Sequence, residues 1–144
     1  MSDLIEHILR LRQTGASVDV MAKKIGASPF AVRDARDRFT IEAMKAGNTF
    51  QRAGEALNTR RGRVCQDYHL AGNRFAQRAL PWGRRSIKDC GYFSPHLEDA
   101  LVRKGLDTLG RIDAAPDDRL LKVDAVGPAK LARIRAVIEW ERGQ

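Results

Sequence analysis

The sequence is poor in cysteine and histidine and has no long apolar run. Its two cysteines, Cys65 and Cys90, are isolated from each other and from any histidine pair, which excludes a visible disulfide framework or zinc-ligand spacing. No apolar stretch approaches the roughly 20 residues that a membrane-spanning helix needs. The first residues also lack the basic start of a secretory signal peptide. We therefore expect a cytoplasmic protein that does not enter a membrane.

The chain also lacks a constellation that would indicate catalysis. His7, His69 and His96 are scattered, no nucleophile lies in a recognisable setting, and no glycine-rich loop is present to hold a phosphate. The neighbouring carboxylates of Asp117 and Asp118 are better explained as acids in the first turn of a helix, where the helix dipole favours them. We expect no enzymatic activity, no cofactor and no bound metal.

Positive charge is what the chain has in excess, with 26 basic and 18 acidic residues and a net charge of +8. The excess is concentrated in the middle of the sequence. Residues 1–39 carry a net charge of +2, residues 40–94 carry +6, and residues 95–144 carry nine charges of each sign. Such a distribution favours a polyanionic partner that contacts the middle segment. The neutral C-terminal segment suits either a local DNA contact or docking to another protein.

Residues 17–32 have the pattern of two short helices joined by a tight turn. A small residue, Ala22, lets the two helices approach closely, and Gly26 permits the left-handed backbone of the turn. Ser28 can cap the second helix, and Pro29 suits its first position. The segment resembles the helix-turn-helix of bacterial transcription regulators, with an amphipathic helix before it. Small-residue helical hairpins without a DNA function show the same pattern.

A second copy of this pattern follows at an offset of 32 residues. Val18, Ala22, Ile25 and Val32 recur as Phe50, Gly54, Leu57 and Val64. Asn58 stands in place of the turn glycine, and it is among the residues that best tolerate a left-handed conformation. Residues 40–46 are expected to form the helix that covers this second copy. Two units at one spacing make a chance match less probable.

The two copies differ in what their second helices offer to a partner. The first is expected to expose a mixed set of side chains: Pro29, Phe30, Arg33, Asp34 and Asp37. The second presents a basic and polar set: Thr59, Arg60, Arg61, Arg63 and Gln66. An arginine can bond a guanine through two hydrogen bonds, and a glutamine can do the same with an adenine. We predict that the second unit contacts DNA, the alternative being a solvated basic face.

Residues 72–93 are rich in glycine, proline and arginine and are expected to form a loop or a short extended connector. Arg84 and Arg85 could follow a phosphate backbone or enter a minor groove. Trp82 and Phe93 are more easily explained as apolar anchors.

The last third of the chain has the pattern of a helix-hairpin-helix. In the hairpin, Gly127 would allow a tight turn and Pro128 would start a helix, whose free N–H groups could bind a phosphate beside Lys130. Residues 96–140 resemble the C-terminal domain of the bacterial RNA polymerase α subunit. That resemblance implies minor-groove contact, yet the matching first-helix positions fall at His96 and Asp99, and an acid has the wrong sign for DNA. An ordinary turn between packed helices is the alternative.

Together these patterns predict an all-α protein with three parts: tandem helix-turn-helix units in residues 1–71, a basic connector in residues 72–93, and a helix-hairpin-helix domain in residues 94–144. The predicted function is a sequence-specific, double-stranded-DNA-binding transcription regulator of bacterial or phage type. An activator is favoured over a repressor, with RNA polymerase or another transcription factor as partner, and the patterns leave open whether the chain forms a homodimer. The alternatives are a DNA-processing accessory protein for recombination or packaging, and a protein-interaction adaptor.

Overall fold

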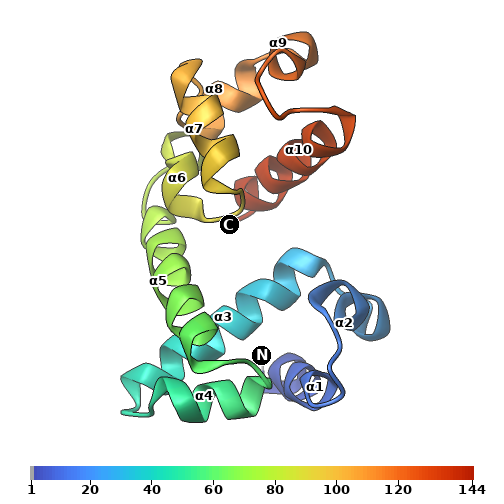
Figure 1. The fold of residues 1–144 in the computed structure, drawn as a ribbon, viewed down its shortest axis with the longest axis vertical. Coiled ribbons are helices and arrows are strands. Elements are labelled where there is room, and N and C mark those ends of the chain that lie inside the picture. Colours follow the sequence, from blue (N-terminus) through green and yellow to red (C-terminus); the bar gives the residue numbers. More distant parts are fainter. Residues whose placement is uncertain (1) are drawn as a thin grey trace. The chain divides into compact units, whose positions relative to one another are not determined.

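The computed structural model describes residues 2–144, with side chains from Asp3 onward, and this part of the chain is all-helical (Figure 1). An isolated bridge between Ser86 and Thr108 is the one β contact found there. The all-α prediction is therefore confirmed. The chain divides into two compact units, one ending at Gly72 and the other beginning at Asn73. The first unit contains α1 (Ser2–Arg12), α2 (Val18–Ile25), α3 (Pro29–Lys45), α4 (Phe50–Leu57) and most of α5 (Arg61–Gln77).

The first unit repeats one pair of helices, and every bound of the second pair lies 32 residues after its counterpart in the first. Helices α2 and α4 have eight residues each, and α3 and α5 have 17. The local causes repeat as well. The hydroxyl groups of Ser17 and Thr49 each accept a hydrogen bond from a backbone N–H of the helix that follows. Gly26 and Asn58 end these helices in the left-handed conformation, with φ of 77° and 51°.

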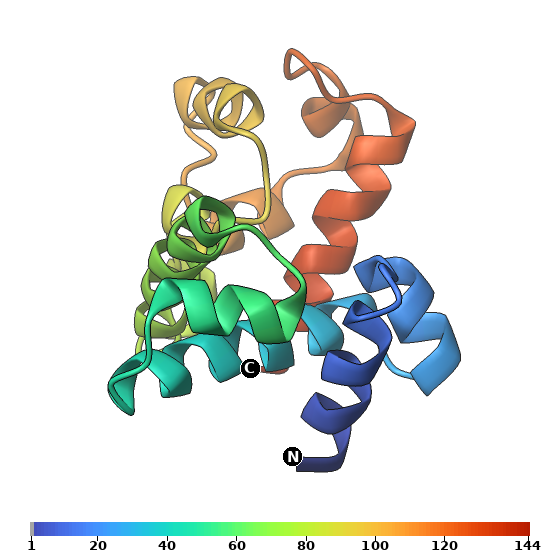
Figure 2. The ribbon, with the colours of Figure 1, turned by 60° about the horizontal axis from the view of Figure 1, so that its bottom comes forward.

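The expectation of a separate covering helix over residues 40–46 is wrong, because α3 continues unbroken to Lys45. No glycine or proline interrupts the helix after its first position, so nothing in the sequence stops it. Its first half buries Val32 in a core with residues of α1 and α2, and its second half brings Ala43 against Ala53 and Val64. Figure 2 shows α3 as one helix with α4 beside it. One long helix therefore serves both pairs.

The central position of α3 also corrects the surface predicted for the first pair. Asp34 and Asp37 were expected to be exposed, and both are buried. The guanidinium of Arg36 lies 3.4 Å from a carboxylate oxygen of Asp37 and 3.7 Å from one of Asp67 on α5. Because α3 packs against helices of both pairs, even its polar side chains are drawn inward.

The C-terminal end of α1 holds the end of α4. Arg12 donates from Nε to the carbonyl of Leu57 at 3.0 Å, and Gln13 donates from Nε2 to the carbonyl of Ala56 at 2.8 Å. Asn58 returns a bond from Nδ2 to the Arg12 carbonyl at 3.1 Å. The last carbonyls of a helix have no partner within the helix, and a cation there also complements the helix dipole. These bonds fix the place where the chain leaves α4 for α5.

The second unit contains the end of α5, the short 3₁₀ helix η1 (Trp82–Arg84), α6 (Ile87–Cys90), α7 (Pro95–Arg103), α8 (Leu109–Ala114), α9 (Asp117–Leu121) and α10 (Pro128–Arg142). Ser94 and Thr108 cap α7 and α8.

The loop expected over residues 72–93 is largely helical instead, with α5 extending to Gln77. Trp82 is half-buried, and the Arg142 guanidinium lies 4.7 Å from its ring centroid. At Gly110 an added Cβ would lie 2.7 Å from the carbonyl oxygen of Gly83, so glycine allows η1 and α8 to touch.

A buried charge cluster lies in this second unit around Glu141, whose side chain has no exposed surface. Arg78 donates from Nε to Glu141 Oε2 at 3.2 Å, and Arg85 places Nη1 3.4 Å from the same oxygen and 2.8 Å from the Glu141 carbonyl. Arg74 is fully buried, with its guanidinium 5.4 Å from the ring centroid of Tyr92. A buried carboxylate with two arginine partners keeps these cations inside the fold.

The contact between α4 and α5 predicts a strict requirement for glycine at position 54. A Cβ there would lie 2.4 Å from the Thr59 carbonyl oxygen and 3.3 Å from a methyl group of Val64. Backbone cannot yield as a flexible side chain would, so Gly54→Ala should destabilise the protein by about 1–3 kcal/mol in urea unfolding followed by circular dichroism. Gly62→Ala is the control, since a Cβ at Gly62 meets nothing within 4 Å. Equal stability of the two variants would contradict this packing.

The buried charge cluster predicts that Glu141→Gln is strongly destabilising. Arg78 and Arg85 would lose their carboxylate partner inside the fold, and breaking one side of a buried pair costs about 3–5 kcal/mol. Glu139→Gln removes an exposed carboxylate on the same helix and should change stability by less than about 0.5 kcal/mol. The measurement is the free energy of unfolding of both variants. A Glu141→Gln protein as stable as the control would refute the role assigned to the cluster.

Candidate nucleic-acid interface

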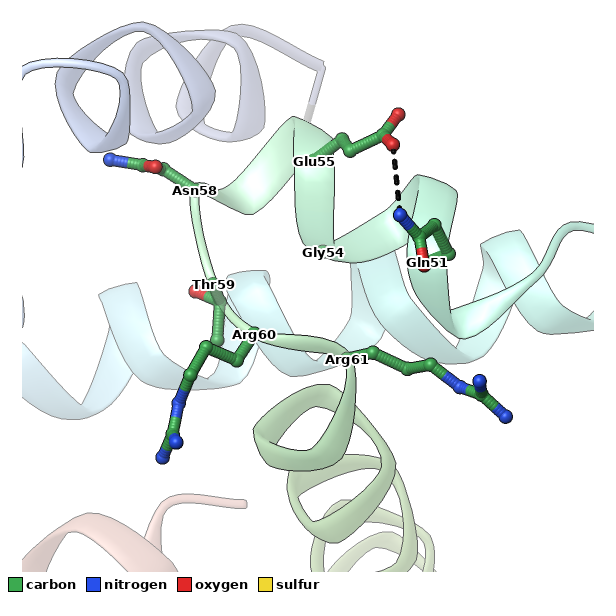
Figure 3. A pocket seen from close by; sticks show the side chains of 7 residues that line it. All are labelled: Gln51, Gly54, Glu55, Asn58, Thr59, Arg60 and Arg61. Carbon is green, nitrogen blue, oxygen red and sulfur yellow. Dashed lines mark hydrogen bonds between the residues drawn. The ribbon is translucent and has the colours of Figure 1, made fainter.

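A shallow groove lies between α4 and the start of α5 (Figure 3). Its volume is about 360 Å³. Its lining residues are Gln51, Gly54, Glu55, Asn58, Thr59, Arg60 and Arg61. The close approach of Gly54 to the Thr59 carbonyl and the left-handed turn at Asn58 set the shape of this groove. The sequence prediction of a basic second unit therefore corresponds to a defined surface.

Arg60 and Arg61 are the exposed cations of this groove. Arg60 precedes α5, and its carbonyl accepts the first-turn hydrogen bond from Val64 N at 3.0 Å. Arg61 is the first residue of the helix. In Figure 3 the two side chains leave the chain in different directions and end in solvent. Neither forms an ion pair within residues 2–144. Two such cations at the positive end of a 17-residue helix make this corner attractive to an anion.

Thr59 has a different role from the DNA contact that was expected. Its hydroxyl donates to the Leu57 carbonyl at 3.0 Å and accepts from Arg12 Nη2 at 3.3 Å. The side chain is half-buried. Thr59 therefore fixes the turn between α4 and α5, and its hydrogen-bonding capacity is used inside the protein.

Arg63 and Gln66 follow on α5 and are both exposed. The Nε atom of Arg63 lies 3.1 Å from a carboxylate oxygen of Asp67, one turn further along the helix. Gln66 lies on the outward side of α5, opposite the buried side chains of Val64 and Ala71. Arg63 can leave its exposed ion pair at small cost, because such pairs contribute little. The outward face of α5 therefore offers an amide and a loosely held guanidinium.

The groove also contains groups that were not predicted. Glu55 places a carboxylate at its edge, and Gln51 donates to that carboxylate at 3.4 Å. Figure 3 shows both side chains on α4, on the far side of the groove from the arginines. The 32-residue offset was the signal that could have identified them, since it places them at the positions of Asp19 and Lys23 in the first pair. The negative charge confines anion binding to the α5 side of the groove.

A corresponding groove of about 470 Å³ lies in the first pair and is lined by Asp19, Ala22, Lys23, Gly26, Ala27 and Pro29. Each of these residues precedes a lining residue of the second groove by 32 positions. The charges differ, because the first groove has one acid and one lysine, whereas the second has two arginines and one acid. The shape is repeated and the positive charge is not.

Arg84 and Arg85 differ in their exposure to solvent. Arg84 is exposed in η1 and remains available to a partner. Arg85 is buried and bonds through its guanidinium to Leu80, Glu141 and Gln144. The prediction that Arg85 contacts DNA is therefore wrong. Its charge is used inside the second unit, where Glu141 is close enough to neutralise it.

The hairpin between α9 and α10 differs from the prediction in its backbone. Gly127 has a φ of −104°, which any residue can adopt, and a Cβ there would meet nothing within 4 Å. The left-handed residue is Ala125, with a φ of 69°. Pro128 starts α10 as predicted, and Lys130 is exposed in its first turn. Because Gly127 has no side chain, the N-terminal end of α10 stays accessible. The turn itself does not require a glycine at this position.

The start of α7 is acidic, as the sequence suggested for Asp99. Lys88 donates to an Asp99 carboxylate oxygen at 2.6 Å, and this hydrogen bond lowers the pKa of Asp99 and raises the pKa of Lys88. Burial raises the pKa of Glu98 to about 7. The start of α7 is therefore a poor surface for a phosphate.

Cys90 on α6 is not a candidate nucleophile. Burial raises the pKa of its thiol to about 12, so Cys90 is protonated at neutral pH.

Comparisons with models of protein families, with characterised proteins and with solved structures gave no match. Among residues 2–144, no three histidine, cysteine or acidic side chains gather closely enough to hold a metal ion. None of the helices described is both long enough and apolar enough to cross a membrane.

The hairpin geometry predicts that Ala125→Gly stabilises the protein. A left-handed conformation costs an L-residue roughly 1–2 kcal/mol, and glycine avoids that cost while losing somewhat more entropy on folding. We expect a net gain of about 0.5–1 kcal/mol in the free energy of unfolding. Ala132→Gly is the matched control on exposed α10, and it should lose about 0.5–1 kcal/mol. A loss of stability in both variants would show that Ala125 is not strained.

Proposed function

We propose that this chain binds double-stranded DNA through the start of α5 and acts as a transcription regulator. The observation that carries the proposal is the pair of exposed guanidinium groups of Arg60 and Arg61, which flank the groove at the positive end of α5 and form no ion pair with the residues that the structure describes. Phosphate contacts by such groups supply most of the affinity of a protein for DNA, and they position the helix that follows.

Once phosphate contacts have positioned α5, side chains on its outward face could recognise DNA bases. Gln66 and Arg63 project from the first two turns of the helix, where side chains of a recognition helix reach base edges. The glutamine amide suits an adenine and the arginine suits a guanine. Gly62 leaves the same face of the helix open to close approach, since nothing lies within 4 Å of its missing side chain. Sequence preference would come from these positions.

The second unit fits the role of a recruiting module in this proposal. Its resemblance to the C-terminal domain of the RNA polymerase α subunit suggests contact with DNA or with the transcription machinery, and an activator function follows from that analogy. The acidic start of α7, with Asp99 held by Lys88, disfavours a minor-groove contact there. Docking to RNA polymerase or to another transcription factor is therefore the role we favour for this face.

A DNA-processing accessory protein is the second candidate. One observation favours it: Arg63 pairs with Asp67, whereas Arg60 lies immediately before α5 and Arg61 at its first position, and such positions suit phosphates better than bases. Such a protein would bind duplexes of any sequence with similar affinity. Selection of preferred sites from a random duplex library distinguishes the two functions, because a regulator enriches a defined motif and an accessory protein enriches none.

The proposal predicts that Arg60→Ala, Arg61→Ala and Arg63→Ala together abolish the electrophoretic mobility shift of a DNA duplex. Loss of three phosphate or base contacts should lower affinity by about 100-fold or more near 0.15 M salt. The control variant, Lys23→Ala, Lys24→Ala and Lys45→Ala, removes the same number of exposed cations from the first unit away from this groove. It should retain most of the binding. Undiminished binding by the arginine variant would eliminate this interface.

A further inference from the structure

The C-terminal segment is neutral in total, yet its charges are unevenly distributed over the surface. Within residues 95–144, six of the nine acids lie within 4 Å of a basic group elsewhere: Asp99, Asp107, Asp113, Asp117, Glu139 and Glu141. Their partners are Arg78, Arg85, Lys88, Arg111, Arg135 and Arg142. Most carboxylates of the segment are therefore already in ion pairs. The other basic residues of the segment have few carboxylates left with which to pair.

Four of those remaining cations gather where α7 and α9 end. They are Arg103, Lys104, Arg119 and Lys122, and we call them the Lys104 patch. Two small hollows lie next to each other at this place, and Lys104 lines both of them. One has a volume of about 180 Å³ and is also lined by Arg103 and Asp124, and the other has about 220 Å³ and is also lined by Arg119 and Lys122. Asp124 is the single acid among their lining residues.

A hydrogen bond within the fold brings the patch together. The Nη2 atom of Arg119 on α9 donates to the Lys104 carbonyl at the end of α7, at 3.2 Å. Lys104 and Lys122 are both exposed, and within residues 2–144 neither side chain forms an ion pair or a side-chain hydrogen bond. Their backbone N–H groups already bond to the last carbonyls of α7 and α9, so their side chains are not needed to cap those helices. Folding alone does not explain this clustering of like charges.

We infer that the Lys104 patch is a second DNA contact, which binds the phosphate backbone independently of sequence. Four cations around two hollows complement a run of phosphates, whereas the groove beside α5 has two and faces a carboxylate. The inference rests on the proposed DNA-binding function and adds the surface by which the second unit takes part. It also assigns DNA contact to the C-terminal ends of α7 and α9 rather than to the acidic start of α7.

The test is the salt dependence of DNA affinity, measured by fluorescence anisotropy with the full chain and a 40-base-pair duplex. The variant is Lys104→Gln with Lys122→Gln, which keeps the structural bond of Arg119. Each lost phosphate contact lowers the slope of log affinity against log salt by about 0.9, so the double variant should lower it by about 1.8. Affinity near 0.15 M salt should fall roughly tenfold or more.

The matched control is Lys88→Gln with Arg111→Gln. It removes the same formal charge from exposed positions of the second unit, where each cation is paired with an acid. This control should change the slope by less than half of the patch effect. Thermal unfolding of each variant checks that the fold is retained.

The outcomes separate the two proposals. If Arg60→Ala with Arg61→Ala lowers the slope and the patch variant matches its control, the inference is overturned and the proposed function stands. If the wild-type chain shows no salt-dependent binding to DNA, both are overturned. A patch variant that lowers the slope by about 1.8 while its control does not supports the second contact.

Discussion

The short turn between α4 and α5 is the constraint on which the candidate interface depends. Gly54 allows the Thr59 carbonyl to come within a distance that no side chain would permit, and Asn58 supplies the left-handed residue that ends α4. Arg12 and Gln13 then occupy the terminal carbonyls of α4. Together these contacts fix where α5 begins, and Arg60 and Arg61 project from that point. The positions of the two arginines are therefore set by contacts within the first unit.

Sharing of α3 between the two helix pairs has a further physical consequence. A helix that packs against both pairs has little outward surface, which explains why Asp34 and Asp37 are buried. It also makes the first unit one body, since its two apolar cores lie along the same helix. The first groove keeps the shape of the second without its positive charge. In a DNA-binding function, this division would leave the first pair to support the second.

Net charge was an incomplete guide to the surface of this protein. Of the cations between residues 40 and 94, Arg85 is buried and Arg78 is nearly so because both pair with Glu141, and Arg74 is buried against the ring of Tyr92. In the C-terminal segment the opposite happens, since a total of zero hides a cluster of cations around Lys104 that form no ion pair within the described part of the chain. Ion pairing between residues distant in the chain decides which charges a partner can meet. A sum over a stretch of sequence contains no information about that pairing.

Local chemistry in the sequence determined the all-α class, the helix starts at Ser17, Thr49, Ser94 and Thr108, and the 32-residue repeat, because caps, turn residues and apolar periodicity act over a few neighbouring positions. The exposed arginines at the start of α5 also followed from the sequence. Tertiary structure decided the rest: the single long α3, the burial of Arg85, the structural use of Thr59, and the left-handed Ala125 in place of Gly127. The burial of Arg85 against Glu141 and the bond from Arg12 to Thr59 join segments far apart in the chain, and such contacts leave no local pattern in the sequence.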